Sequence, residues 1–166
     1  MHSTHEKIVL TSRWWPGLLV FIGAASGLWA ICAVPLVSFA VVSGLTLKQR
    51  QASLALGTVW LIHQIMGFTL HHYPRTPDAF AWGLMLGLAS WAALLVCQKI
   101  AGSLQPATAA IGSLLSGFVV YELLLWCASF VLGGGETFSN SIVAALLLVN
   151  AAWTAGLMAL HRLVKG

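Results

Sequence analysis

The sequence predicts an all-α integral membrane protein: a single domain in which six transmembrane helices form a bundle and both chain ends lie in the cytoplasm. The first observation behind this prediction is composition. Of the 166 residues, 59% are hydrophobic and only 7% are charged, whereas about a quarter of an ordinary soluble domain is charged. A soluble fold of this length could not bury so much apolar surface, so lipid is the expected solvent. The formal net charge of +4 then reflects basic loops beside a membrane, and no nucleic-acid partner is expected.

The second observation is the spacing of the apolar segments. Charged residues, prolines and glycines divide the chain into six of them, each expected to cross the membrane. The predicted spans are residues 15–33, 35–47, 51–70, 77–96, 106–132 and 137–160. The first follows Arg13 and is expected to be retained, because its apolar run is too long for a signal peptide. The others begin at or just after residues that break or charge a helix, in order Pro35, Arg50, Pro77, Pro106 and the Gly133–Glu136 loop.

The third observation is the placement of the basic residues, and it decides whether the short second span is kept. Residues 35–47 are about thirteen in number, against the roughly twenty that a straight span needs. With six crossings, only Arg75 lies on the outer side, and the inner side holds Lys7, Arg13, Lys48, Arg50, Lys99, Arg162 and Lys165. Such an excess of basic residues marks the cytoplasmic side. Omitting the second span destroys the asymmetry, so the sequence predicts six.

Small residues recur at four-residue spacing in four of the spans. The pairs or runs are Gly23 and Gly27; Gly83 and Gly87; Gly112 and Ser116; and Ala151, Ala155 and Ala159. Small residues let helices approach closely in lipid, where packing drives association. Two interpretations stay open: the bundle packs against itself, or a ridge on the first or sixth helix docks another membrane protein.

Three polar residues are predicted to lie near the middle of the membrane. At 1.5 Å per residue, His63 is roughly 12 Å below His71, Glu122 roughly 15 Å below Leu132, and Asn150 roughly 20 Å below the outer end of its helix. A carboxylate at that depth is costly unless it is paired or protonated. We therefore expect either a buried hydrogen-bond cluster of the three residues, or the floor of a cavity or part of a proton path.

The outer loop "HHYPRTPD" carries most of the polar chemistry. His63, Gly67 and His71 share one helix face, with a glycine that leaves space between two imidazoles. His71 and His72 are adjacent and cannot chelate one ion from a helix end. A lone imidazole there suits one axial bond to a metal already held by a macrocycle. The alternative is a helix C-terminus at which imidazole meets free carbonyl groups.

The whole chain resembles a family of vitamin transporters. Its six short helices and polar outer mouth are similar to the substrate-binding S-components of energy-coupling-factor transporters. The stretches "HQIMGFTLHHYPRTPDAFAWG", "YELLLW" and "GGGETF" look more specifically like cobalamin transporters of the BtuM type.

The resemblance implies a multi-pass protein of the bacterial inner membrane that captures a corrinoid from the periplasmic side. His71 or His72 would be the axial cobalt ligand, and the other candidate binding residues are Tyr73, Arg75, Asp78, His63, Glu122 and Asn150. The implied partner is an energy-coupling module of a transmembrane subunit and ATPases, although a solitary transporter is possible. Two departures from the family stand out. Its usual A-x-x-x-A pattern on the first helix is Gly23-x-x-x-Gly27 here, and its cobalt-ligating cysteine is replaced by histidine.

Other classes of function remain open. The chain has no G-x-S-x-G, Walker or H-E-x-x-H motif, so a transporter is favoured over an enzyme. The alternatives are a haem-binding or redox membrane subunit that uses His63 and His71 on separate macrocycles, and a membrane assembly factor without a ligand.

Overall fold

A computed structural model describes the backbone of residues 2–28, 35–103 and 106–165, and the side chains of these ranges except 2–13 and 106–107. Within them the chain is helical and contains no β-strand. The elements are α1 (His2–Ser26), α2 (Leu36–Thr46), α3 (Gln49–Thr69), α4 (Pro77–Ala101), α5 (Pro106–Leu132), the short 3₁₀ helix η1 (Gly135–Phe138) and α6 (Asn140–Lys165). The predicted all-α bundle is confirmed.

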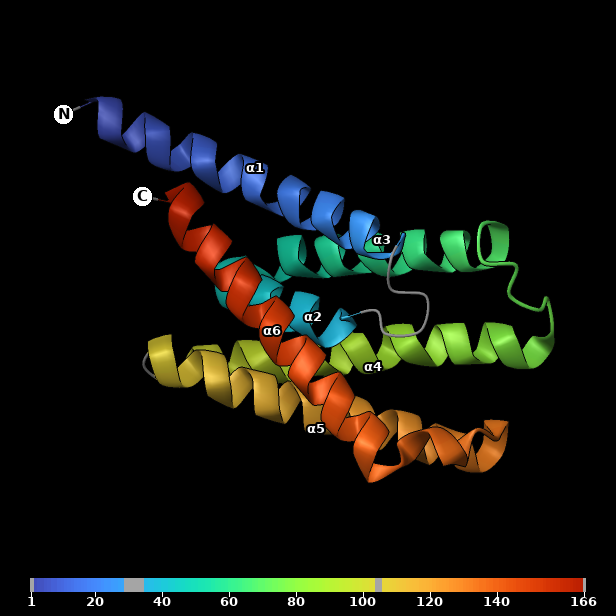
Figure 1. The fold of residues 1–166 in the computed structure, drawn as a ribbon. Coiled ribbons are helices and arrows are strands. Elements are labelled where there is room, and N and C mark those ends of the chain that lie inside the picture. The colour runs from blue at the N-terminus through green and yellow to red at the C-terminus, as the bar shows by residue number, and fades with distance from the viewer. Residues whose placement is uncertain (1, 29–34, 104–105, 166) are drawn as a thin grey trace.

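Successive helices run in opposite directions (Figure 1). Both chain ends lie at one end of the bundle, together with the α2–α3 connection, the end of α4 and the start of α5. We call this the terminal end. The α3–α4 loop, residues 70–76, and η1 lie at the opposite end, which we call the histidine end.

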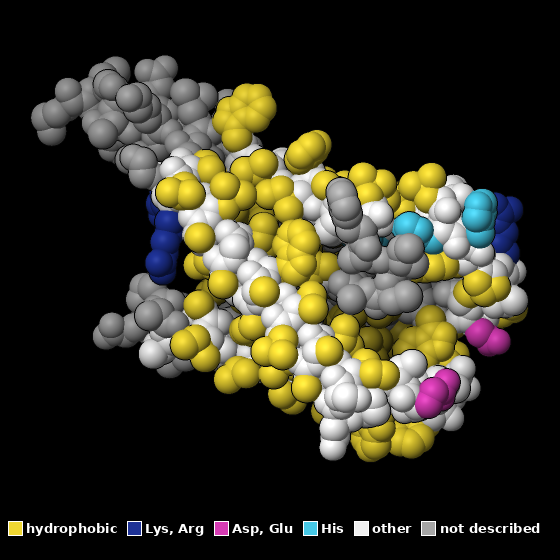
Figure 2. All heavy atoms as spheres, viewed as in Figure 1, with side chains coloured by type: hydrophobic (Ala, Val, Ile, Leu, Met, Phe, Trp, Pro, Cys, Tyr) yellow, Lys and Arg dark blue, Asp and Glu magenta, His cyan; other side chains and the backbone are white. Residues whose placement is uncertain are grey.

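Charged side chains divide between these two ends as predicted. Those described at the terminal end are all basic: Lys48, Arg50, Lys99, Arg162 and Lys165. Those at the histidine end are Arg75, Asp78 and Glu136, and the apolar surface between the ends is almost free of charge (Figure 2). The arrangement fits a membrane protein whose two aqueous faces differ in charge.

Four of the helices are long and apolar enough to cross a membrane: Gln49–Thr69, Pro77–Ala101, Thr108–Leu132 and Asn140–Lys165. The first two predicted spans correspond to shorter apolar segments, the Trp14–Ser26 part of α1 and the helix Leu36–Thr46. The last residues of the first predicted span, 29–33, lie outside the described part of the chain. The fold is therefore that of a multi-pass membrane protein, with four helices long enough to cross the membrane and two shorter apolar helices.

The shortness of α2 has a structural reason. With 11 residues it is about 16 Å long, roughly half the thickness of the hydrocarbon core. It lies in the centre of the bundle, contacts each of the other α-helices, and buries every residue from Leu36 to Gly44. Since the surrounding helices rather than lipid enclose α2, its length is not set by the membrane thickness.

An uncovered N-terminus of α2 would be costly in this buried position, because its first N–H groups have no partner within the helix. The Asn150 side chain of α6 provides a partner for one of these N–H groups. Its side-chain oxygen accepts hydrogen bonds from the backbone N–H of Ser38 at 3.0 Å and from the Ser38 hydroxyl at 2.9 Å. The Asn150 amide nitrogen donates to the Leu146 carbonyl at 2.9 Å. Asn150 is thus a helix cap supplied by a distant segment.

Two of the predicted glycine ridges pack inside the bundle. A Cβ at position 23 would meet Val59, and one at position 27 would lie 2.7 Å from the His63 ring. Gly83 and Gly87 pack in the same way against side chains of α3. The self-packing interpretation is confirmed for these two ridges, and the α1 ridge is not free to dock a partner. On α6, by contrast, Ala155 and Ala159 are exposed.

Candidate functional site at the histidine end

Two histidines, one on α3 and one in the loop that follows it, contact the C-terminal end of α1. His63 Nε2 lies 2.9 Å from the Gly23 carbonyl oxygen, and His71 Nε2 lies 3.0 Å from the Gly27 carbonyl oxygen. A carbonyl oxygen can only accept, so both imidazoles carry hydrogen on Nε2 and donate it. The last carbonyls of a helix have no partner within that helix. The predicted meeting of imidazole with carbonyl groups at a helix C-terminus is therefore present, but the helix end is that of α1 rather than that of α3. The Gly23 carbonyl also accepts from the Ser26 hydroxyl at 2.7 Å.

The end of α3 places its two adjacent histidines in different environments. The His71 N–H donates to the Met66 carbonyl at 3.0 Å, and the Tyr73 N–H donates to the Gly67 carbonyl at 3.0 Å. Between them, His72 has a φ of 53°, the left-handed conformation that glycine usually adopts at a helix C-terminus. The His72 side chain is exposed and makes no hydrogen bond or ion pair with the described residues.

The expected space at Gly67 is filled. The Tyr73 ring covers this glycine so closely that a Cβ there would lie 2.7 Å from two ring carbons. Tyr73 also lies 6.1 Å from His71 and 6.3 Å from Phe68, measured between ring centroids. The glycine therefore accommodates the returning loop, and the Tyr73 ring fills the space beside it.

The beginning of α4 completes the loop. Thr76 is the N-cap, and its hydroxyl oxygen accepts from the Ala79 N–H at 3.4 Å. Pro77 takes the first helical position, where its missing N–H costs nothing. Asp78 lies in the first turn of α4, where the positive end of the helix dipole stabilises its carboxylate.

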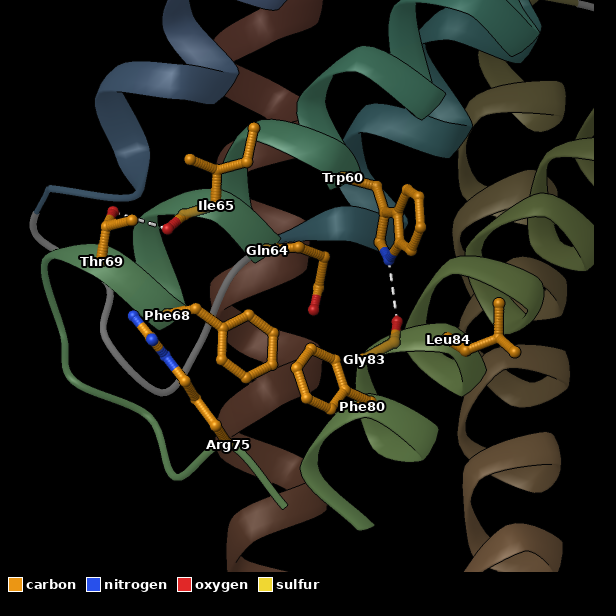
Figure 3. A pocket seen from close by; sticks show the side chains of 9 residues that line it. All are labelled: Trp60, Gln64, Ile65, Phe68, Thr69, Arg75, Phe80, Gly83 and Leu84. Carbon is orange, nitrogen blue, oxygen red and sulfur yellow. Dashed lines mark hydrogen bonds between the residues drawn. The ribbon is translucent and has the colours of Figure 1, made fainter. Parts of the chain in front are cut away.

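A groove of about 440 Å³ lies between α3 and α4 at this end (Figure 3). Its apolar lining comes from both helices: Trp60, Ile65, Phe68, Phe80 and Leu84. The Phe68 and Phe80 rings stack with centroids 4.5 Å apart. The polar groups on its surface belong to Gln64, Thr69 and Arg75, and the Arg75 side chain extends from the loop toward Phe68 and Thr69 (Figure 3). The sequence identified Arg75 as a candidate but gave no sign of a groove.

The three mid-membrane polar residues do not form the predicted cluster. His63 bonds to α1, and Asn150 bonds to Ser38 and Leu146. Glu122 is half-buried and makes no hydrogen bond or ion pair with any residue whose position is described. Sequence reasoning placed all three along their helices by counting residues but could not tell which way each side chain faced. It also missed Ser38, whose only signal was a polar residue within a short apolar segment.

The described side chains include no group of three or more His, Cys, Asp or Glu residues that could hold a metal ion. Of the cysteines in this part of the chain, Cys97 is buried and Cys127 is exposed on α5. A metal bound at the histidine end would therefore need most of its ligands from elsewhere, as a metal in a macrocycle has.

Comparison of the chain with protein-family models, with curated proteins and with solved structures finds no match. The fold and the site by themselves define the class: an all-α, multi-pass membrane protein with a histidine-bearing loop at one end of its bundle.

Proposed function

We propose that this protein is a substrate-capture component for vitamin uptake in the bacterial inner membrane, and that its substrate is a corrinoid taken from the periplasmic side. The observation that carries the proposal is the state of His72. A histidine occupies a left-handed helix-end position that glycine would adopt without strain, and its imidazole is exposed and unpartnered among the described residues. Strained residues of this kind cluster at functional sites.

Of the two candidate ligands, we propose His72 as the one that binds cobalt. The Nε2 atom of His71 already donates to the Gly27 carbonyl, which leaves only Nδ1 for a metal. His72 offers both ring nitrogens. A corrin supplies the equatorial ligands, so one neutral imidazole is all that the protein needs to add.

The surrounding residues receive different proposed roles. Tyr73 and Asp78 lie on the same loop and at the start of α4, where they are exposed enough to contact the amide-rich rim of a corrinoid. Arg75 borders the α3–α4 groove instead. His63 and Asn150 support the fold beneath the site, since their polar atoms already bond to α1 and α2.

The distribution of charge supports a cytoplasmic terminal end, so the histidine end would face the periplasm. An energy-coupling partner would then dock on α6 rather than α1. A second groove of about 400 Å³ lies between these two helices, lined by Ile22, Ala152, Trp153, Gly156, Leu157 and Leu160. Its small residues leave room for another helix, and a Cβ added at Gly156 would meet no atom within 4 Å.

The test is a cobalamin titration of the purified protein, followed through the cobalt-centred visible bands. The wild type is expected to shift these bands on binding. His72→Gly should abolish the shift while the protein stays folded, because glycine suits a φ of 53° and should add about 1 kcal/mol of stability by removing strain. His72→Asn is the matched variant, because asparagine tolerates the same backbone conformation but has no imidazole. It should lose the spectral shift as well.

His71→Ala should retain the spectral shift, although it removes the bond to α1. Loss of the shift in His71→Ala but not in His72→Gly would reverse the assignment. No shift in the wild type, or a Soret band in the protein as purified, would overturn the corrinoid proposal and favour the haem alternative in the second case.

A further inference from the structure

The groove between α3 and α4 has features that corrinoid capture does not use. It is open on the side of the bundle, and three of its lining side chains, Ile65, Phe80 and Leu84, are each more than half exposed. In a membrane protein these side chains face lipid. A groove that opens on this lipid-facing side is reached from the bilayer rather than from water.

The groove contains an unpaired amide. Gln64 projects toward the Phe68 and Phe80 rings (Figure 3) and makes no hydrogen bond with the residues described. A Cβ at the facing Gly83 would collide with the Gln64 side-chain oxygen, so only glycine leaves the amide its place. The neighbouring Trp60 Nε1 is already used, since it donates to the Gly83 carbonyl at 2.8 Å. A polar group in an apolar environment favours any ligand that can hydrogen-bond to it.

The mouth of the groove is positively charged. Arg75 is the only lysine or arginine described at the histidine end, and it makes no ion pair with a described carboxylate. Its guanidinium lies near Thr69 (Figure 3), in a position to bind a phosphate through two parallel hydrogen bonds.

The spacing of these groups matches one kind of amphiphile. Gln64 lies five residues below Thr69 on α3, or about 7.5 Å along the helix axis. In a bilayer, roughly 5–7 Å separates the head-group surface from the edge of the hydrocarbon core. A lipid with its phosphate at Arg75 would therefore bring its ester groups near Gln64 and its acyl chain between Trp60 and Leu84.

From this geometry we propose that the α3–α4 groove binds one anionic phospholipid of the outer leaflet, with Arg75 on the phosphate, Gln64 on an ester carbonyl and the aromatic wall along one acyl chain. Charge complementarity at Arg75 selects an anionic head group over a zwitterionic one. The bound lipid would brace the loop that presents His72, because Arg75 is three residues along the same loop.

The test is native mass spectrometry of the full chain in a mild detergent, titrated with phosphatidylglycerol or with phosphatidylcholine of the same acyl chains. The wild type should bind the first phosphatidylglycerol at least about tenfold more tightly than the first phosphatidylcholine. Arg75→Gln should remove this preference. Arg50→Gln is the matched control, since it deletes an exposed arginine at the opposite end and should keep the preference.

Two further variants separate the groove from the charge. Leu84→Trp should lower the affinity for both lipids by narrowing the groove, and His72→Gly should bind phosphatidylglycerol as the wild type does. Excess inorganic phosphate should leave the lipid bound, because it cannot occupy the apolar part.

The proposal is overturned by equal affinity of the wild type for the two lipids, by an equal loss in Arg50→Gln and Arg75→Gln, by an unchanged affinity in Leu84→Trp, or by displacement with phosphate alone. None of these results measures cobalamin binding, so the two proposals can fail separately.

Discussion

The side-chain oxygen of Asn150 on α6 accepts a hydrogen bond from the backbone N–H of Ser38 on α2, 3.0 Å away and 112 residues apart in the sequence. This bond allows a helix to begin inside the bundle. The residue that precedes the helix, Pro35, provides no side-chain cap of its own. Asn150 therefore performs for α2 the task that a local serine or aspartate performs in most helices.

Replacing Asn150 with leucine should destabilise the protein strongly. The change leaves the Ser38 N–H without its partner in a site where water is scarce, at a cost of about 1–3 kcal/mol. Thermal unfolding in detergent measures the loss. Asn140→Leu is the control, because Asn140 is exposed at the start of α6 and should change stability little. Equal unfolding temperatures for Asn150→Leu and the wild type would contradict the capping role.

Thr154 offers the opposite case one turn further along α6. Its hydroxyl oxygen is buried and has no hydrogen-bond partner among the described residues. Thr154→Val removes this hydroxyl while keeping the shape, so we expect stability to rise, by about 1 kcal/mol, rather than fall. A clear decrease in unfolding temperature would show that the hydroxyl has a partner, such as a bound water.

The packing of α1 on α3 predicts unequal effects of alanine at its glycines. Gly23→Ala and Gly27→Ala place a methyl group against Val59 and the His63 ring, and each should cost about 1–3 kcal/mol through overpacking. Gly17→Ala on the same helix is the control. A Cβ there meets nothing within 4 Å, so the better helix propensity of alanine should make the change neutral or slightly favourable. Similar losses at all three positions would argue against the observed helix contact.

The charge distribution predicts orientation in the membrane. A reporter that is active only in the cytoplasm should work when fused after residue 166, and a reporter that is active only in the periplasm should work in the loop at Thr76. The physical reason is the concentration of basic residues at the terminal end, which resists translocation. Activity in the reverse pattern would contradict both this orientation and capture from the periplasmic side.

Several features followed from the sequence because their causes are local. Apolar runs bounded by charged and helix-breaking residues predicted all six α-helices. For α5 the predicted and observed bounds, 106–132 and Pro106–Leu132, agree, because a proline and a glycine run delimit it. The division of charge between the two ends also followed, since it depends only on how many times the chain reverses.

The tertiary structure alone decided which polar groups meet. His63, Glu122 and Asn150 were predicted at similar depths, and depth follows from counting residues along a helix. Their partners depend on how each helix is rotated about its axis, which is set by packing between helices far apart in the sequence. For the same reason His71 proved to bond with α1, Gly67 to accommodate Tyr73, and Gln64 to face a groove. Helix periodicity specifies which residues share a face of one helix. Which neighbouring helix each face contacts depends on how all of the helices pack together.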